Sequence, residues 1–373
     1  MSYLDKLLDG VEVEWKTLGE VIKLEKGKQL NKELLSESGL YPAYNGGTSY
    51  SGYTDIYNYH ENTTIISQGG ASAGFVNYVT TKFYANAHCY VILPKIEIVE
   101  NRFIYHFLKL NQEKLMTKQH GAGIPALRTD EITGIQIPIP PLPVQKEIVR
   151  ILDSFTELTA ELTAELTAEL TARKKQYSYY REQLLSFEEG EVEWKTLGSL
   201  AENLDSMRKP VTSGLRDAGD IPYYGASGIV DYVKDYIFDG DFLLVSEDGA
   251  NLIARNTPIA FSISGKTWVN NHAHVLKFNT YAERRFVEYF LNSIDLMPYI
   301  SGAAQPKLNQ RNLNSIKIPN PSLEEKTKIV SILDKFDTLT TSISEGLPKE
   351  IELRKKQYEY YRDLLLKFPL SES

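Results

Sequence analysis

The sequence predicts an α+β protein arranged as a pseudo-twofold tandem repeat, in which two similar globular domains are separated by a long antiparallel helix pair. The repeat is evident because the segment VEWKTLG occurs at Val13–Gly19 and again at Val192–Gly198. Later matches keep the same order and pair residues 102–108 with 285–291, 137–140 with 318–321, 148–155 with 329–336, and 173–181 with 354–362. Such a duplication presents two similar surfaces, and this is the main indication of function.

Composition and charge restrict the class of protein. The 373 residues, 42% of them hydrophobic, are enough for two packed domains. No apolar run approaches the roughly 18 residues of a membrane span. The N-terminal segment MSYLDKLLDG lacks the basic and apolar regions of a signal peptide. Since Cys89 is the single cysteine, an intramolecular disulfide is excluded and we expect a cytoplasmic protein.

The net charge of −8 argues against a simple basic DNA-binding protein, whose affinity would come largely from neutralising phosphates. The distribution of charge weakens this objection. Residues 151–190 contain four basic and eight acidic side chains, so half of the excess acid lies in this short segment. The globular parts are near neutral, and a near-neutral domain can still carry a basic face.

The segment from Val144 to about Phe187 is predicted to form one long helix, because its apolar residues recur at spacings of three and four. Prolines precede it, where they are tolerated. Within it, Thr-Ala-Glu-Leu occurs three times in succession over Thr159–Leu170. A period of four drifts by about 40° per repeat in an ideal helix, so the leucines form a winding ridge that favours a packing partner. The alternative is a surface helix of low complexity without a partner.

The expected partner is the second-half segment from about Leu323 to Phe368, which has matched length. Its Gly346-Leu347-Pro348 should break the helix, with Pro348 restarting it. The opening residues Tyr3–Leu8 resemble Tyr180–Leu185, so the two chain ends should lie in equivalent surroundings. The resulting division places globular domains at 1–142 and 190–320 and helices at 143–189 and 321–373.

The globular domains, about 11–142 and 191–320, are predicted to mix short strands with helices. We expect strands at Thr63–Ser67 and Phe242–Ser246, and helices at Arg102–Lys118 and Arg285–Met297. The loops between the shared segments diverge strongly. One scaffold with different loops indicates similar sites that recognise different targets.

Residues able to carry chemistry do not form a recognisable catalytic centre. His272 and His274 could ligate a metal, but zinc-site cysteines and an HExxH motif are absent, which favours a structural or polar role. Gly69–Gly74 matches no phosphate loop or dinucleotide fingerprint and indicates a tight turn. The acidic pair Glu247-Asp248 is expected in a solvated turn. Asn320–Leu323 is not the signature of an amino-group DNA methyltransferase.

What remains is recognition, because each domain has amide and basic side chains near glycines. Amides and guanidinium groups read base edges, while lysines hold phosphates. The candidate DNA-binding residues are Lys26, Lys28, Gln29, Gln119, Arg128, Arg208, Lys209, Asn251, Arg255, Lys307, Gln310 and Arg311. We place Arg128 and Arg311 in the loops that follow Gly121 and Gly302. For each candidate, ordinary surface exposure is the alternative.

This layout resembles the specificity (S) subunit of type I restriction–modification enzymes over essentially the whole chain. The resemblance rests on the two VEWKTLG segments, the junction IPIPPLPxQxxI at 137–148, the helix endings RKKQYxYYR and the Thr-Ala-Glu-Leu repeats. The second junction departs from the pattern, with Lys326 where the first has Gln145, and Pro348 interrupts the second helix.

The resemblance implies two target-recognition domains, each binding one half of an asymmetric, bipartite double-stranded DNA sequence. It implies that the paired helices set the gap between half-sites and dock two methyltransferase (modification) subunits. Those subunits bring S-adenosylmethionine and methylate adenines, and two restriction subunits bring ATP- and Mg-dependent translocation and cleavage. The S subunit itself is expected to hold no cofactor or metal and to be non-catalytic.

The tyrosines at the helix endings are the expected partner-binding residues. They are Tyr177 and Tyr180 in the first repeat and Tyr358 and Tyr361 in the second. Packing within the helix pair is the alternative role for these four. Two other functions remain open at this point: a free-standing bivalent binding protein, and an enzyme with an unrecognised site at His272 and His274.

Overall fold

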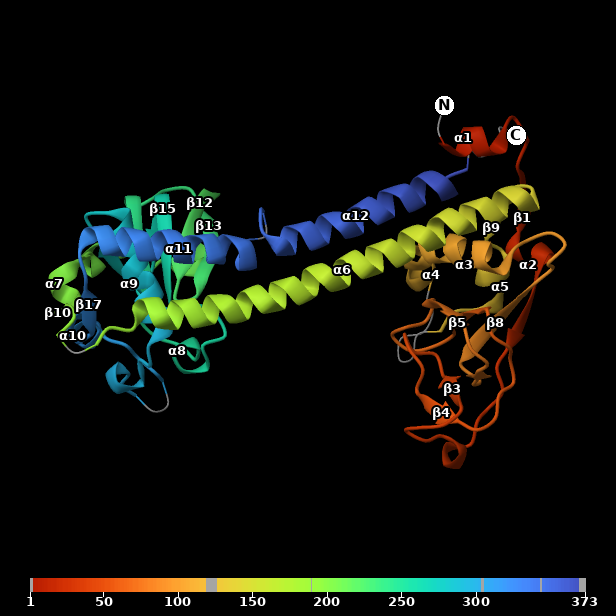
Figure 1. Ribbon diagram of the computed structural model, residues 1–373, viewed down its shortest axis with the longest axis horizontal. Coiled ribbons are helices and arrows are strands. Elements are labelled where there is room, and N and C mark those ends of the chain that lie inside the picture. The colour runs from red at the N-terminus through yellow and green to blue at the C-terminus, as the bar shows by residue number, and fades with distance from the viewer. Residues whose placement is uncertain (1–2, 119–125, 189, 303–304, 343, 369–373) are drawn as a thin grey trace. The chain divides into compact units, whose positions relative to one another are not determined.

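The computed structural model describes residues 3–118, 126–188, 190–302, 305–342 and 344–368. The chain divides into two compact units, one formed by Met1–Glu165 with Ile351–Ser373 and the other by Leu166–Glu350. Each unit contains one globular domain together with helical segments from both sequence repeats (Figure 1). No helix in the described part of the chain combines the length and apolar character of a bilayer crossing.

The first globular domain is a mixture of small sheets and short helices, as predicted. Its strands are β1 (Glu14–Thr17), β2 (Ile22–Lys26), β3 (Tyr41–Tyr44), β4 (Gly52–Thr54), β5 (Thr63–Ser67), β6 (Val76–Val79), β7 (Tyr84–Ala85), β8 (Cys89–Pro94) and β9 (Gln136–Ile139). Its helices are α1 (Tyr3–Leu8), α2 (Leu18–Val21), η1 (Lys32–Leu34), α3 (Asn101–Leu110), α4 (Gln112–Thr117) and α5 (Thr129–Thr133). The expected helix Arg102–Lys118 is therefore two helices separated at Asn111.

Three sheets organise this domain. The VEWKTLG strand β1 pairs antiparallel with β9 from the proline-rich junction. A four-stranded sheet has the order β2-β8-β5-β6, and a three-stranded sheet has the order β4-β3-β7. All five residues of β5 are buried, because the strand is central in its sheet. The expected strand Thr63–Ser67 coincides with β5.

The second globular domain repeats this plan with a larger sheet. Its strands are β10 (Glu193–Thr196), β11 (Glu202–Asn203), β12 (Ala218–Gly225), β13 (Gly228–Val233), β14 (Phe238–Ser246), β15 (Ala260–Val269), β16 (Ala273–Lys277) and β17 (Lys317–Asn320). Its helices are α7 (Leu197–Leu200), η2 (Asp205–Met207), η3 (Ser213–Leu215), α8 (Asn251–Ala254), α9 (Tyr281–Ser293), η4 (Met297–Tyr299) and α10 (Gln310–Ser315). The sheet order is β11-β16-β14-β15-β12-β13, while β10 pairs with β17 as β1 does with β9.

The predicted long helix is α6 (Leu142–Leu185), a 44-residue helix that continues from the first unit into the second. The second helical segment is interrupted as predicted, giving α11 (Leu323–Thr341) and α12 (Leu347–Leu366). Gly346 permits this interruption, because a Cβ atom there would lie 2.4 Å from the Thr338 carbonyl oxygen. Leu162, Leu166 and Leu170 of the repeats are half-buried, so the leucine ridge is only partly covered within this chain.

Each unit contains an antiparallel helix contact of the same kind. In the first unit, Phe155 of α6 stacks on Tyr361 of α12, with ring centroids 5.2 Å apart. In the second, Phe336 of α11 stacks on Tyr180 of α6, with centroids 5.6 Å apart. Phe155 and Phe336 occupy equivalent positions in the two repeats, as do Tyr180 and Tyr361. In both contacts, a phenylalanine of one repeat therefore stacks on a tyrosine of the other repeat.

The two ends of the described chain lie together in the first unit, but α1 does not take the position that its resemblance to Tyr180–Leu185 predicts. Leu4 and Leu8 of α1 are buried in the same apolar cluster as Leu365 and Leu366 of α12. In the first unit, the end of α12 occupies the position that the end of α6 occupies in the second unit. Phe368 packs on Phe103 with ring centroids 6.3 Å apart, as Phe187 packs on Phe286 at 6.4 Å. The helix α1 is an additional element beside it.

Candidate nucleic-acid interface

Each globular domain is attached to its helices through an arginine–aspartate pair. In the first unit, Arg102 Nε donates to Asp153 Oδ1 of α6 at 2.9 Å, and His106 Nε2 lies 2.8 Å from the same oxygen. Burial lowers the pKa of His106, although Asp153 opposes this effect. Burial raises the pKa of Asp153, but the hydrogen bond with His106 and the charge of Arg102 together bring it below its ordinary value.

The second unit uses the equivalent pair with more ionic contacts. Arg285 Nε donates to Asp334 Oδ1 of α11 at 3.0 Å, and the Tyr289 hydroxyl donates to the same oxygen at 2.6 Å. Glu288 lies 2.5 Å from Arg285 and Asp337 lies 3.4 Å from it. Burial raises the pKa of Glu288, and this effect exceeds the opposing charge of Arg285. Both attachments fix the orientation of a domain on its helices.

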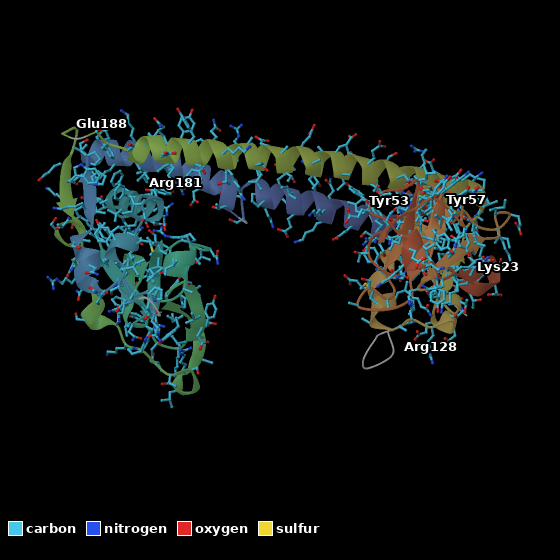
Figure 2. All side chains as sticks on the ribbon, turned by 90° about the horizontal axis from the view of Figure 1, so that it is seen from below. Lys23, Tyr53, Tyr57, Arg128, Arg181 and Glu188 are labelled. Atoms are coloured by element: carbon cyan, nitrogen blue, oxygen red, sulfur yellow. The ribbon has the colours of Figure 1, made fainter. Side chains whose placement is uncertain are left out.

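The structure brings several predicted residues of the first domain to one edge of the sheet. Lys26 ends β2 opposite Tyr90 of β8, and the Tyr90 hydroxyl donates to the Leu127 carbonyl at 3.1 Å. Arg128 follows Leu127, precedes α5 and is 62% exposed (Figure 2). Lys28 and Gln29 are exposed just beyond β2. Gln119 lies outside the described residues.

An edge equivalent to this one in the second domain contains Lys307, Gln310 and Arg311. The Lys307 ammonium is half exposed and lies 3.0 Å from Glu247. Gln310 Nε2 donates to Asn203 Oδ1 at 2.8 Å, and its side chain is exposed. Arg311 is exposed on α10, so the predicted loop is wrong here: the Asn309 side chain accepts from the Asn312 amide and starts a helix.

Arg208 belongs to a buried ion cluster at this edge. Its guanidinium lies 2.6 Å from Glu247 and 3.5 Å from Asp205, and it donates to the Ala273 carbonyl. With 13% of its side chain exposed, Arg208 is engaged within the domain and is poorly placed to read a base. Lys209, the next residue, is exposed.

The expectation of a solvated turn at Glu247 is wrong. Glu247 is 8% exposed, and its charge is compensated by Arg208 and Lys307, which come from distant segments. Burial raises the pKa of Glu247, but hydrogen bonds from those two cations together hold it below its ordinary value. The sequence contained an indication of this burial, because Glu247 directly follows the predicted strand Phe242–Ser246.

His274 completes the cluster, and its contacts favour a structural role for this histidine over metal ligation. His274 Nδ1 lies 2.5 Å from Asp205 Oδ2, and Nε2 donates to the Leu308 carbonyl at 2.7 Å. Asp205, Glu247 and His274 are close enough to ligate a cation. Arg208 and Lys307 already supply positive charge to both carboxylates, however, so this arrangement is satisfied by the protein itself. The other histidine, His272, pairs with Asp248 at 2.9 Å.

The remaining candidates, Asn251 and Arg255, make local contacts. The Asn251 side chain bonds both the amide and the carbonyl of Thr257, which closes a loop. Arg255 donates to the Ile294 carbonyl at 2.8 Å, and burial lowers its pKa. Arg255 also lines a cavity of about 470 Å³ with Arg181 of α6.

The predicted partner-binding tyrosines pack between helices. Tyr180 and Tyr361 stack on phenylalanines but stay 40% and 37% exposed. Tyr177 stacks on Phe336, and the Tyr358 hydroxyl lies 3.2 Å from Thr156 Oγ1. Sequence reasoning overlooked their neighbours Tyr179 and Tyr360, which are 60% and 61% exposed. The repeated motif RKKQYxYYR already contained both.

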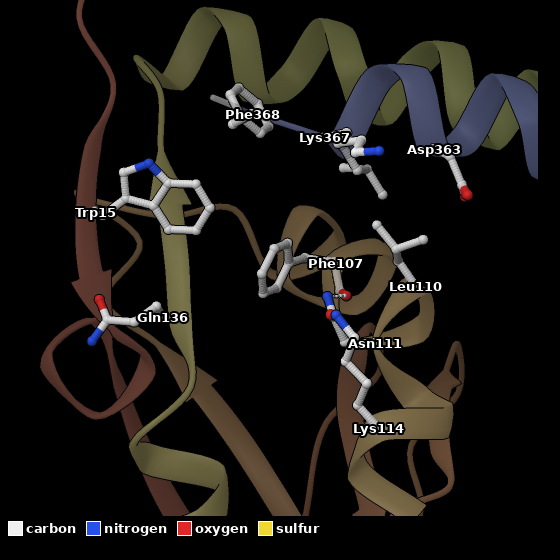
Figure 3. A pocket seen from close by; sticks show the side chains of 10 residues that line it. Trp15, Phe107, Leu110, Asn111, Lys114, Gln136, Asp363, Lys367 and Phe368 are labelled. Atoms are coloured by element: carbon white, nitrogen blue, oxygen red, sulfur yellow. Dashed lines mark hydrogen bonds between the residues drawn. The ribbon is translucent and has the colours of Figure 1, made fainter. Parts of the chain in front are cut away.

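A cavity of about 480 Å³ marks the junction of the first domain with α12 (Figure 3). Trp15 of the VEWKTLG strand, Phe107 of α3 and Phe368 beyond α12 line it. The counterparts of Trp15 and Phe107 in the second repeat, Trp194 and Phe290, have ring centroids 6.1 Å apart. Polar residues, among them Asn111, Lys114 and Asp363, line most of the rest of this cavity, where the first domain meets α12.

Comparisons with known proteins agree with this geometry. The family model for the type I restriction modification DNA specificity domain matches residues 10–172 and 189–353. The specificity subunit of the Escherichia coli enzymes EcoR124I and EcoR124II is 36% identical, over 100% of this chain and 98% of that protein. A putative type I restriction enzyme specificity subunit of Haemophilus influenzae is 37% identical, over 98% of each.

A solved structure shows the same fold. The S subunit of a type I restriction–modification system from M. genitalium superposes with a TM-score of 0.57, covering 97% of each chain at 21% identity. Two tandem matches of one domain model account for the duplicated strands, helices and attachments described above. The chain belongs to the type I restriction–modification specificity subunits.

Proposed function

We propose that the two recognition domains bind the two halves of a bipartite, asymmetric double-stranded DNA sequence through their equivalent edges. As a specificity subunit, the chain is a non-catalytic component that gives a type I complex its DNA target. The observation that carries the proposal is the pair of edges formed by Lys26 with Arg128, and by Lys307 with Arg311, on repeated frameworks. Exposed cations there can contact phosphates or guanine edges in the major groove.

The same repetition supports two sites for modification subunits. Tyr179 and Tyr360 are exposed at equivalent positions on α6 and α12, each in edge-to-face contact with the tyrosine that follows it. Exposed aromatic side chains are favoured anchors of protein interfaces. We infer one modification subunit on each motif. Those subunits supply S-adenosylmethionine and methylate adenine, and two restriction subunits supply ATP- and Mg-dependent translocation and cleavage.

The long helix α6 provides the spacing between half-sites. It is continuous through all three Thr-Ala-Glu-Leu repeats, so each repeat adds about 6 Å of rise and about 40° of net rotation. One base pair of B-DNA rotates the groove by about 34–36° and advances it by about 3.4 Å. One repeat therefore matches one base pair closely in rotation and exceeds it in length by about 2–3 Å.

A domain exchange tests the proposal. Residues 11–142 are replaced by the same region of a relative, and the methylated sequence of the assembled complex is determined by sequencing. We expect one half-site to change while the other half-site and the gap stay the same. A chimera that changes both half-sites would show that the domains do not read DNA independently.

A further inference from the structure

The two recognition domains share a backbone frame at the edge proposed to meet DNA. Ser67 pairs with Cys89 in the first sheet, and Ser246 pairs with Ala273 in the second. The residues that follow these four in the sequence therefore correspond as well: Gln68 corresponds to Glu247, and Tyr90 corresponds to His274. The backbone bonds agree: the Leu127 amide donates to the Gln68 carbonyl at 2.8 Å, and the Leu308 amide donates to the Glu247 carbonyl at 2.7 Å.

A side chain then binds the carbonyl of the same leucine in each domain. In the first, the Tyr90 hydroxyl donates to the Leu127 carbonyl, and Gln68 Nε2 donates to the Tyr90 hydroxyl at 3.2 Å. In the second, His274 Nε2 donates to the Leu308 carbonyl. A neutral tyrosine and a histidine in an ionic cluster thus make the same bond, which we name the carbonyl latch.

The latch holds the residue at which the proposed DNA-binding segment begins. Leu127 and Leu308 are 1% and 0% exposed, whereas exposed side chains start at Arg128 in the first domain and at Gln310 in the second. Arg128 and Asn309 are the N-caps of α5 and α10, so fixing the leucine fixes the start of each helix. Displacement of the leucine would move Arg128 in one domain, and Gln310 with Arg311 in the other.

We propose that Tyr90 and His274 are positioning residues for DNA recognition, each orienting the DNA-binding segment of its own domain through the carbonyl latch. The proposal rests on the function proposed above. The two nitrogens of His274 separate this role from simple stabilisation of the domain. Nδ1 belongs to the ion pair with Asp205, while Nε2 alone makes the latch.

Two substitutions distinguish the nitrogens. In His274→Gln, the amide group can reach the position of Nε2 and keep the latch while the contact with Asp205 is lost. In His274→Asn, the shorter amide can keep the contact with Asp205 while the latch is lost. Tyr90→Phe is the matched change in the first domain, because it removes the hydroxyl and keeps the ring.

The test measures base preference at each half-site. The chain, assembled with its modification subunits and S-adenosylmethionine, methylates a pool of DNA duplexes of random sequence, and sequencing gives the preferred motif. We expect His274→Asn to reduce discrimination about tenfold at the second domain's half-site only, since a buried carbonyl loses its donor. Tyr90→Phe should do the same at the other half-site, and His274→Gln should retain the wild-type preference.

The outcomes separate the two proposals. If the wild-type complex yields no bipartite motif, the proposed function fails. If the motif appears but His274→Gln and His274→Asn are equally impaired, or both half-sites change together, the positioning role is overturned. If both histidine variants unfold at a clearly lower temperature than the wild type, Tyr90→Phe is the deciding variant. An unchanged base preference at the first half-site then rejects the latch, and a change at that half-site alone supports it.

Discussion

The first and second domains are attached to their helices by the same arginine–aspartate contact but surrounded by different groups. Arg102 lies over the rings of Tyr78 and Tyr105, with ring centroids 4.2 and 4.7 Å from its guanidinium carbon, and bonds the single carboxylate of Asp153. Arg285 lies over one ring, that of Tyr289 at 4.5 Å, and bonds three carboxylates, those of Asp334, Glu288 and Asp337. The duplication has thus kept the geometry of attachment while its electrostatic surroundings changed.

The junctions between β-strand and helix show the same contrast. Gln145 is fully buried and donates to the carbonyls of Ile98 and Pro140, while its oxygen accepts from the Glu100 amide. Its counterpart Lys326 is 6% exposed and donates to Asn320 Oδ1 at 2.6 Å. A neutral network in one repeat corresponds to a cation in the other. Divergence has therefore replaced interactions without changing the positions that they hold.

The largest effect is expected from altering α6 between the two attachments. Deleting Thr167–Leu170 removes one repeat and should shorten the methylated motif's gap by one base pair, with both half-sites unchanged. Deleting two or three residues leaves a rotational error of about 160° or 60° and should abolish methylation. The motif of each variant complex is read by sequencing methylated DNA. A four-residue deletion that methylates only the original spacing would contradict this role of the helix.

Removing the attachment arginines compares the two units directly. Arg285→Ala leaves the buried carboxylate of Glu288, with the partly exposed Asp334 and Asp337, without its cation and should destabilise the second unit by about 3–5 kcal/mol. Arg102→Ala should cost less, about 1–3 kcal/mol, because the single carboxylate of Asp153 is 40% exposed and keeps its contact with His106. Hydrogen exchange of amides in each unit measures both changes. Equal losses of protection in the two variants would show that the extra carboxylates around Arg285 contribute nothing.

Exposed and packed tyrosines of the repeated helix motif should behave differently. Tyr179→Glu combined with Tyr360→Glu should weaken assembly with the modification subunit by about 2–4 kcal/mol, since exposed aromatic anchors lose their contacts. Tyr180→Phe with Tyr361→Phe keeps the stacked rings and is the control. Co-purification and titration of the two components measure the effect. Undiminished assembly of the glutamate variant would exclude these tyrosines from the interface.

Arginines at the two edges should give the smallest, half-site-specific losses. Arg128→Ala and Arg311→Ala should each weaken DNA binding by about 1–3 kcal/mol if the arginine reads a base, or lower the salt slope by about one if it binds a phosphate. Binding of the assembled complex to its methylated motif, measured over a range of salt concentrations, distinguishes these effects. Neither arginine touches DNA if affinity and salt slope both stay unchanged.

Local pattern in the sequence was sufficient to predict the repeat, the long helix, the break at Gly346–Pro348 and the strand Thr63–Ser67. Helical and strand periods depend on neighbours a few residues apart, and a proline or glycine acts on the backbone where it stands. The resemblance to a specificity subunit rested on the same local segments. These features required no knowledge of long-range contacts.

Tertiary structure alone decided what the charged and aromatic side chains do. Glu247 is buried because the fold brings to it Arg208, which precedes it in the sequence, and Lys307, which follows it. Arg208 is held by this ion pair inside the domain. Tyr180 is 40% exposed and the adjacent Tyr179 is 60% exposed, because Tyr180 stacks on Phe336 of α11. Burial of a charge requires a compensating partner, and that partner is set by the register of distant segments.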